Sequence, residues 1–469
     1  MLITAPAFAT VYTVKPSGGD YSTISSCASA AQAGDTCEVY DGTYSGGVSP
    51  PRDGSAANWI TFKAAAGNSP VMSGGWSIGG RDYIEINGFT CGAFSGSGIT
   101  NVKIMNNLIQ NVHDGISLRQ AFDILVSGNT FNNISGDMIR QFGQRWVVRN
   151  NTVMGETDSR NEHMDFWQSW CESGSTIPAS YVLIENNSYI DISGGNVHFT
   201  LINSTNDCSG PPTNHIYRYN KVHDIGSRGH YIDANAAHPS TGHNVIYNNT
   251  YSYIDNGSES IDNAHSFTAS DDSSAINNIL VNSMSRSRAK GFSGGSGWSQ
   301  SYNLYYSSNG NMSFSGAASN ETGAVKNQNP LLVNPANNDF SLQEDSPAID
   351  SGGPLTNVAS GDSGSGTSLI VDDANFFQDG WAGADPDWIA VGTTSNVVQI
   401  LSINYGTGTI TLASSISRND NDPIYLYKDS DGTRVLYGSF PDIGASEYNN
   451  GAPGAPAPVN NLRIIDVVL

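Results

Sequence analysis

A short motif recurs along the middle of this chain and constrains its fold more than any other feature. Each copy joins alternating apolar residues, an asparagine and a second alternating run, as in ILVSGNTF around Asn129 and VLIENNSY around Asn187. The motif asparagines are Asn87, Asn107, Asn129, Asn151, Asn187, Asn220, Asn249, Asn278 and Asn303, spaced by 20, 22, 22, 36, 33, 29, 29 and 25 residues. A basic period of about 22 residues with variable additions is typical of a solenoid whose insertions fall on one side.

The building block of this solenoid is a short strand. The apolar residues alternate with period two, and asparagine or glycine interrupts each run, which favours strands over helices. Asparagine tolerates the left-handed backbone of a sharp corner, and its amide can hydrogen-bond to the asparagine of the next coil. The repeat therefore predicts stacked parallel coils with a ladder of asparagines at one corner.

Composition agrees with this interpretation and excludes several other classes. Charged residues make up 14% of the 469 residues, Gly contributes 51 of them, and the formal net charge is −22. A nucleic-acid-binding protein needs a basic surface, and a helical bundle needs many Glu, Lys and Ala residues, so neither class fits. Hydrophobic residues reach 38%, enough for a packed core, so we do not expect a disordered chain.

The N-terminus and the cysteines predict a secreted protein. Residues 1–9 (MLITAPAFA) are similar to the last part of a secretory signal and its cleavage site, and no later run approaches the length of a membrane-spanning helix. Of the five cysteines, we expect Cys27 to pair with Cys37 and Cys171 with Cys208, leaving Cys91 in the core. Four cysteines allow three pairings, so this connectivity is one choice of three.

The sequence resembles the right-handed parallel β-helix superfamily of secreted carbohydrate-active proteins, over residues 10–448. The opening YTVKPSGGDYSTI is similar to the N-terminal cap of that superfamily, and SLQEDSPAIDSG (residues 341–352) and PDIGASEY (residues 441–448) are similar to its closing coils. The resemblance implies an all-β fold, with a right-handed parallel β-helix and N-terminal cap over residues 10–350. It specifies the fold strongly and the activity weakly.

The remaining C-terminal part is predicted to form separate units. Residues 351–440 form an acidic insertion whose short runs, such as NVVQILSINYGTGTITL, predict a small antiparallel β unit. Residues 441–450 form a closing coil. Residues 451–469 combine a Pro/Ala/Gly linker with an apolar strand, LRIIDVVL. That strand either docks on its own solenoid or pairs with a neighbouring molecule, which would give self-association.

A polar strip is expected on one face of the solenoid. Stacking the strands that follow each asparagine places seven residues in one outward column: Ser117, Ile139, Asp165, His198, Asp233, Asp262 and Lys290. We expect His163, Trp167, Tyr231 and Asn235 on the same face, with Arg140, Arg160 and Arg228 nearby. The long insertions fall on these coils, and loops beside a polar strip make a cleft. A register error of one residue would turn any of these side chains inward.

The superfamily resemblance implies a polysaccharide lyase that cleaves a uronate-containing glycan by β-elimination. That reaction needs a base, a group that neutralises the carboxylate, and an acid for the leaving oxygen. The predicted catalytic residues are His163, Asp165, His198, Tyr231, Asp233 and Lys290, and the predicted substrate-binding residues are Arg140, Arg160, Trp167, Arg228 and Asn235. Asp165, Asp233 and Asp262 are predicted ligands of a Ca²⁺ ion, which would offset the repulsion between an acidic protein and an anionic glycan.

Two alternatives stay open at this point. A glycoside hydrolase or uronate epimerase could use the same aspartates, since carboxylates on adjacent or alternate coils fall near the separations that hydrolysis needs. A structural or adhesive extracellular protein, linked into fibres through its C-terminal strand, would need no catalytic residues. The polysaccharide partner is common to both enzyme classes.

Overall fold

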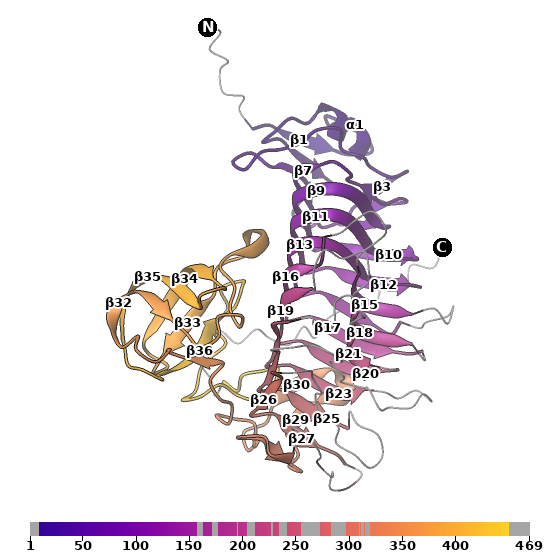
Figure 1. Ribbon diagram of the computed structural model, residues 1–469. Helices are drawn as coiled ribbons and strands as arrows, with labels where there is room; N and C mark the ends of the chain where they lie inside the picture. The colour runs from indigo at the N-terminus through magenta and orange to yellow at the C-terminus, as the bar shows by residue number, and fades with distance from the viewer. Residues whose placement is uncertain are drawn as a thin grey trace.

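The computed structural model describes residues 9–156, 163–170, 177–194, 196–203, 212–226, 228–233, 242–254, 273–282, 297–308, 310, 314 and 319–449, and it is a right-handed parallel β-helix (Figure 1). The α-helix α1 (Ile24–Ala30) covers the N-terminal end, with the Thr23 side chain accepting from the amide of Ser26 at its N-cap. The coils then stack in order down the solenoid. The predicted fold class is confirmed.

Two long parallel sheets form the walls. The larger, within the described residues, has the path β1 (Val11–Val14), β2 (Thr36–Val39), β4 (Ile60–Ala64), β7 (Asp82–Asn87), β9 (Phe94–Met105), β11 (Ile116–Ser127), β13 (Ile139–Arg149), β16 (Ser180–Glu185), β19 (Thr213–Arg218), β22 (Asn244–Tyr247), β24 (Ser274–Ile276) and β26 (Ser299–Ser301). The other contains β3 (Thr43–Tyr44), β5 (Val71–Met72), β8 (Thr90–Cys91), β10 (Leu108–Val112), β12 (Thr130–Ile134), β14 (Thr152–Met154), β17 (Ser188–Ile192), β20 (Lys221–Ile225), β23 (Thr250–Ile254), β25 (Ile279–Val281), β27 (Leu304–Tyr306) and β28 (Val325–Lys326).

A third face branches from the larger sheet. The strands β9, β11 and β13 are long enough to cover two faces, and the register between β11 and β13 shifts between Leu118 and Ala121 where they turn. From the next coil onward the third face has its own strands, β15 (Met164–Trp170), β18 (Val197–Asn203) and β21 (Arg228–Asp233), which pair in parallel with β13 and with each other. A short strand, β6 (Trp76–Ser77), pairs with the first part of β9. We call this wall the third face.

The predicted asparagine ladder is present and buried. From Asn107 to Asn303, each Nδ2 donates to Oδ1 of the next ladder asparagine at 2.9–3.0 Å, and that oxygen also accepts a main-chain N–H. Glu321 ends the ladder by accepting from Asn303 Nδ2 at 2.8 Å. The prediction for Asn87 is wrong, because Phe89 takes the ladder position of that coil and donates its N–H to Asn107 Oδ1. Asn87 lies two positions earlier and accepts from Asn106, a residue with φ of 53°. Left-handed corner residues therefore form a second column beside the buried ladder.

The cysteine predictions are confirmed where the structure describes them. Cys27 and Cys37 form a disulfide with Cα atoms 6.1 Å apart, which ties α1 to β2. Cys91 is free and buried in the solenoid core. The predicted pair Cys171–Cys208 lies outside the described residues. No helix within the described ranges is long and apolar enough to cross a bilayer.

A six-stranded antiparallel unit follows the solenoid, as predicted. A small ribbon of β29 (Leu332–Asn334) and β30 (Asp339–Leu342) leads to strands in the order β31 (Thr356–Asn357), β36 (Pro423–Lys428), β33 (Trp388–Val391), β34 (Val397–Asn404), β35 (Thr409–Arg418) and β32 (Gly364–Ile370). A bridge between Val358 and Val371 joins the two edges into a barrel-like unit, which we call the C-terminal domain. It stands beside the solenoid (Figure 1).

The C-terminal domain packs on an apolar column of the larger sheet. Leu125, Val147, Leu183, Ile216 and Val245 stack in register on successive coils and share one hydrophobic cluster with residues of the domain such as Trp381. Arg218, fully buried, donates to Asp387 of the domain at 2.8 Å and to Glu185 of the solenoid at 2.5 Å. The interface therefore combines apolar packing with a buried ion-pair network.

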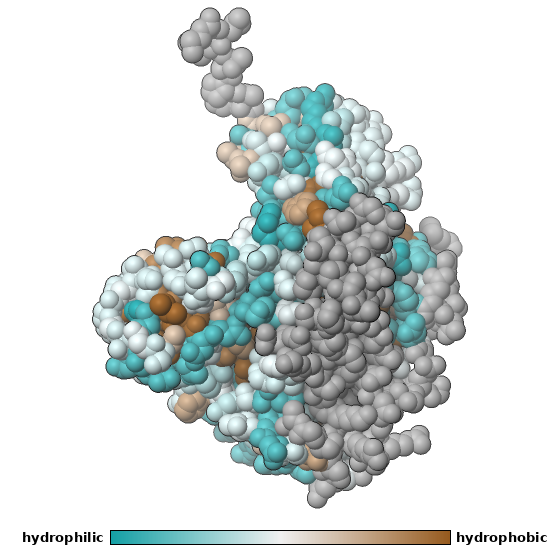
Figure 2. All heavy atoms as spheres, in the orientation of Figure 1, coloured by the Kyte–Doolittle hydropathy of each residue, from teal (hydrophilic) through white to brown (hydrophobic). Residues whose placement is uncertain are grey.

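Hydropathy differs between the two parts of the visible surface. The described surface of the solenoid is mostly hydrophilic or neutral on this side, whereas apolar residues gather on the C-terminal domain (Figure 2). Two of the exposed large hydrophobic residues, Ile370 and Leu401, belong to that domain. Single exposed apolar residues are normal on soluble proteins and need no further explanation.

Candidate functional site

The third face carries a column of acidic and histidine side chains at the point where each coil enters its strand. Asp114 Oδ1 accepts the N–H of Asp137 at 3.3 Å, and Asp137 Oδ1 accepts the N–H of Asp165 at 3.0 Å. Asp165 is then in register with His198 on the next coil. The four residues Asp114, Asp137, Asp165 and His198 thus follow one another on successive coils, and we call them the acid–histidine column.

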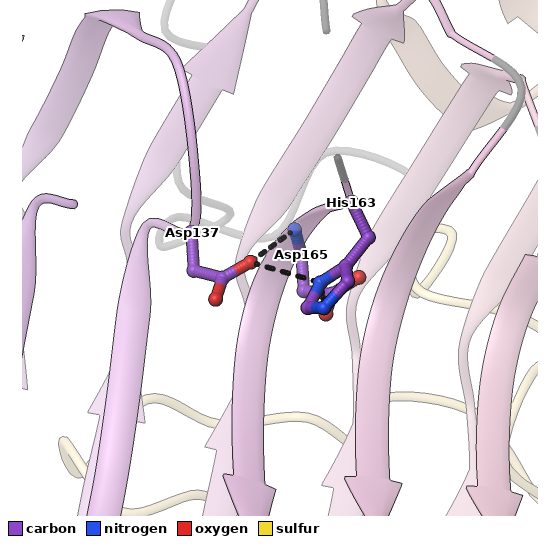
Figure 3. A group of neighbouring side chains, drawn as sticks. All are labelled: Asp137, His163 and Asp165. Carbon is purple, nitrogen blue, oxygen red and sulfur yellow. Dashed lines mark hydrogen bonds and ion pairs between the residues drawn. The ribbon is translucent and has the colours of Figure 1, made fainter. Parts of the chain in front are cut away.

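The carboxylate of Asp165 contacts two imidazole rings. Its Oδ1 lies 2.7 Å from His198 Nδ1, and its Oδ2 lies 3.1 Å from Nδ1 of His163. The Asp165 carboxylate is buried and the His198 ring is nearly so, whereas the His163 side chain is 36% exposed. Asp137 from the preceding coil points at the His163 ring and at the main-chain nitrogen of Asp165 (Figure 3). Buried carboxylates therefore fix a histidine that reaches the surface.

Arg140 lies in the next outward position of β13 and is held by the same column. Its Nε donates to Asp137 Oδ2 at 2.6 Å, and its Nη1 donates to Asp114 Oδ2 at 2.7 Å. The Arg140 side chain remains 26% exposed. Such charge-assisted bonds are short and directional, so the guanidinium is fixed with part of its surface facing solvent.

The electrostatics of the cluster favour a protonated His163. Hydrogen bonds to Asp137 and Asp165 raise the pKa of His163 to about 10. Burial opposes ionisation of Asp165, but the charge of His198 and the hydrogen bonds of both histidines outweigh it and lower the Asp165 pKa. Burial and the charge of Asp165 raise the pKa of Asp137, against the bonds from His163 and Arg140. At neutral pH two of the partly exposed groups over this acidic column, His163 and Arg140, are therefore cations.

Four of the predicted site residues come together here: His163, Asp165, His198 and Arg140. The prediction for Trp167 as an outward sugar-binding residue is wrong, because its ring is fully buried in the core and its Nε1 donates to Gln141 at 2.8 Å. Ile139 is also in the core. Phe166 and Trp167 both point inward, so the alternation that placed Trp167 outside breaks between them.

Other predicted residues fall in different columns or outside the description. Arg228 is in register with His198, but Tyr231 pairs with Leu201 and Asp233 with Asn203, so the main chain of β21 places these two residues beyond the acid–histidine column. The side chains of Arg228, Tyr231 and Asp233 are outside what the structure describes. The whole residues Arg160, Asn235, Asp262 and Lys290 lie outside the described residues, and their roles stay predictions.

Sequence reasoning missed Asp114, Asp137, His113 and Trp170. His113 Nδ1 lies 2.9 Å from Asp114 Oδ1, and the partly exposed Trp170 contacts Phe142 with ring centroids 4.6 Å apart. A signal was present for the aspartates: Asp-Gly-Ile at residues 114–116, Asp-Met-Ile at 137–139 and Asp-Phe-Trp at 165–167 share one pattern on three coils. Aligning on that pattern, instead of on the distance from each asparagine, finds the column.

The described ligand groups fit a calcium ion poorly. Asp137, His163 and Asp165 each offer an atom within 4.8 Å of the others. However, all four carboxylate oxygens already face protein donors, and Ca²⁺ prefers a cage of six to eight oxygens. An imidazole with two carboxylates suits a transition metal better. Of the predicted set Asp165, Asp233 and Asp262, the structure describes only the side chain of Asp165.

The sequence matches no family model and no curated protein. Solved structures that are similar to this chain include the pectate lyase Pel9A, with 16% identity and a TM-score of 0.47 over 75% of this chain and 94% of that one. An alginate lyase from Paenibacillus sp. shows 15% identity and a TM-score of 0.33 over 66% and 98% of the two chains. XylC in complex with xylose shows 11% identity and a TM-score of 0.42 over 93% and 98%. The register of its own strands, independent of these likenesses, makes the chain a right-handed parallel β-helix protein.

Proposed function

We propose that the protein is a secreted polysaccharide lyase that cleaves a uronate-containing glycan on the third face. The observation that carries the proposal is that Arg140 and His163, both partly exposed, share the buried carboxylate of Asp137. The fixed guanidinium of Arg140 suits the carboxylate of a uronate, because electrostatic stabilisation works best when the charge is already in place, and His163 beside it offers a base once its ring has lost the proton. The protein as a whole is strongly acidic, so a local cationic surface on it indicates an anionic ligand.

The steps of the reaction are assigned to different side chains. In β-elimination a base takes the C5 proton, the electrons form the C4–C5 double bond, the C4–O bond breaks, and the leaving oxygen takes a proton. We assign neutralisation of the uronate carboxylate to Arg140 and proton abstraction to His163 in its neutral form. Asp165 and His198 are positioning residues, because the carboxylate and the ring are buried and hold His163 from below.

The hydrolase alternative has less support from the described residues. A glycosidase needs two carboxyl groups that reach the scissile bond, but the side chains of Asp137 and Asp165 are both 0% exposed. A uronate epimerase would use the same proton abstraction without breaking the C4–O bond, so it differs from a lyase only in its product. The structural alternative rests on residues 451–469, which lie outside the described part of the chain.

Calcium binding and secretion are parts of the same proposal. The Cys27–Cys37 disulfide fits an oxidising compartment, and the composition of residues 1–9 fits a signal sequence. A Ca²⁺ ion would need Asp233 and Asp262 as ligands without Asp165, because both oxygens of Asp165 already contact histidine rings. It would supply a further positive charge to the glycan carboxylate.

The test is an activity assay with polygalacturonate, alginate and a glycosaminoglycan, each with added Ca²⁺ or with EDTA. New ultraviolet absorbance from an unsaturated uronate supports the lyase, and dependence on Ca²⁺ supports the metal. Reducing ends without this absorbance contradict the lyase in favour of a hydrolase. A change in the uronate epimer without cleavage contradicts it in favour of an epimerase, and no change in any glycan contradicts the enzyme.

Matched arginine variants test the assignment to the third face. Arg140→Lys keeps the charge but loses the forked contact with Asp114 and Asp137. Arg145→Lys is the control, because Arg145 makes a similar forked pair with Asp123 on the other face. We expect KM to rise about tenfold in Arg140→Lys and to stay unchanged in Arg145→Lys. Equal effects would contradict the assignment.

A further inference from the structure

A cavity of about 470 Å³ opens between the C-terminal domain and the end of the solenoid. The domain contributes the loop 371–375 and the turn 405–408, and the solenoid contributes His243, Ser274, Gly297 and Ser299. This volume is within the range of about 300–1,000 Å³ that small-molecule sites occupy. The cavity is not part of the third face, because its solenoid strands β24 and β26 belong to the larger sheet.

The outward column of the larger sheet changes from apolar to polar residues where the cavity begins. The outward column of the larger sheet is apolar from Leu125 to Val245, where the C-terminal domain covers it. The next two positions in register are Ser274 and Ser299, and both line the cavity. Their hydroxyl oxygens lie 2.7 Å apart. If the domain simply continued to cover this column, apolar residues would stabilise the contact better, so the serines indicate a polar occupant.

The opposite wall is polar and fixed. Asp373 Oδ1 accepts from the N–H and from Nδ2 of Asn375 at 2.8 and 2.7 Å, and Asn375 in turn accepts from Asn214 of the solenoid at 2.5 Å. The Tyr405 hydroxyl donates to the carbonyl of Phe377 at 3.0 Å, which fixes the ring at the edge of the cavity. A site whose groups are already held in place loses little entropy when it binds.

The charge of the cavity selects against anions. Its described lining contains the carboxylates of Asp372 and Asp373 together with hydroxyl groups, and no Lys or Arg. This is the opposite of the third face, where Arg140 and His163 reach the surface. Carboxylates and hydroxyls suit the vicinal hydroxyl groups of an uncharged sugar, and a tyrosine ring suits the C–H face of a pyranose.

We propose that this cavity binds a short neutral oligosaccharide, at a site separate from the third face. The carboxylate of Asp372 accepts from sugar hydroxyls, and Ser274 and Ser299 line the floor under the ring. A polysaccharide that carries both neutral and uronate sugars would then contact the protein at two surfaces of different charge. The proposal does not depend on the lyase activity, because it concerns binding at another surface.

The test is isothermal titration calorimetry on the full chain with cellotetraose, xylotetraose and mannotetraose, and with tetragalacturonate for comparison. We expect saturable binding of at least one neutral tetraose. In Asp372→Ala we expect an affinity about tenfold lower, as for the loss of a hydrogen bond to a charged group. Asp345→Ala, an exposed carboxylate that does not line the cavity, is the control and should bind as the wild type does.

A second variant closes the site from the solenoid side. Ser299→Leu extends the apolar column into the cavity, and we expect it to abolish binding of the neutral tetraose. An Arg140→Lys variant should keep that binding, which separates the cavity from the third face. Absence of binding by all three neutral tetraoses would overturn the proposal. Unchanged affinity in both Asp372→Ala and Ser299→Leu would overturn it as well.

Discussion

Asp165 on β15 and His198 on β18 face each other in register on neighbouring coils, with Oδ1 and Nδ1 2.7 Å apart. Because the solenoid repeats every coil, two residues separated by 33 positions become direct neighbours. The pair is buried, so it supports the exposed His163 without contacting solvent itself. The chemistry proposed for the third face depends on this support.

Asp165→Asn should leave the fold intact and lower turnover. The amide keeps the shape of the side chain but removes the charge that holds His163 and His198. We expect kcat measured above pH 10, where the His163 ring of the wild type is also neutral, to fall by about 10²-fold or more, with a smaller change in KM. The assay is the ultraviolet absorbance of the unsaturated product, with Asp345→Asn as the surface control. An unchanged kcat would contradict the role of Asp165 as a positioning residue.

Lyase activity should rise with pH toward the alkaline range. His163 has a pKa of about 10, raised mainly by its hydrogen bonds to Asp137 and Asp165, and only its neutral form accepts a proton. A plot of kcat against pH should therefore keep rising until the pH approaches this value. A maximum near pH 6, or a profile that is the same in His163→Gln, would contradict the assignment of the base.

The same shift predicts a pH dependence of stability with a defined sign. The folded pKa of His163, about 10, exceeds the ordinary histidine value of 6.5, so the protonated ring stabilises the folded state. This contribution is complete below about pH 6.5 and is lost as the pH rises through 10. The Tm difference between wild type and His163→Gln should be constant below pH 6.5 and vanish above pH 10. A difference that grows with pH would contradict the sign.

Removing the buried arginine at the domain interface should destabilise the protein strongly. Arg218→Met leaves Glu185 and Asp387 buried without their shared cation. We expect the free energy of unfolding to fall by about 3–5 kcal/mol, as for other broken buried pairs. Urea denaturation measures it. The control Arg145→Met breaks the half-exposed pair with Asp123 and should cost less than about 1 kcal/mol. Similar losses in both variants would contradict the importance of the buried network.

Substitution of a ladder asparagine should destabilise the folded protein. Asn187 Nδ2 and Oδ1 bond to the ladder partners on both adjacent coils in a fully buried position. Asn187→Ala leaves buried main-chain and side-chain groups unpaired, and we expect a loss of about 2–3 kcal/mol or more. Asn68→Ala, in an exposed turn of the N-terminal part, serves as the comparison and should cost clearly less. Equal losses would contradict a structural role for the ladder.

The sequence by itself determined the repeat, and with it the parallel β-helix, the asparagine ladder and the Cys27–Cys37 pair. The β-helix and its ladder depend on local patterns that repeat on every coil, because each coil contacts only its neighbours. The Cys27–Cys37 pair was predicted from the closeness of the two cysteines in the sequence. The sequence also placed His163, Asp165 and His198 on one face, and the structure brings these three side chains together. Asp165 and His198 are in register on neighbouring coils.

Only the tertiary structure decided which residues of the third face share a column. Phe166 and Trp167 both turn inward within β15, so period two fails there and Trp167 enters the core while Trp170 is partly exposed. Counting from the ladder asparagines also misplaced Tyr231 and Asp233, because Arg228 is the residue in register with His198. The contact of the C-terminal domain with the solenoid, and the cavity between them, depend on residues far apart in the sequence, such as Arg218 and Asp387. No local pattern contains that information, because it arises from the packing of two surfaces.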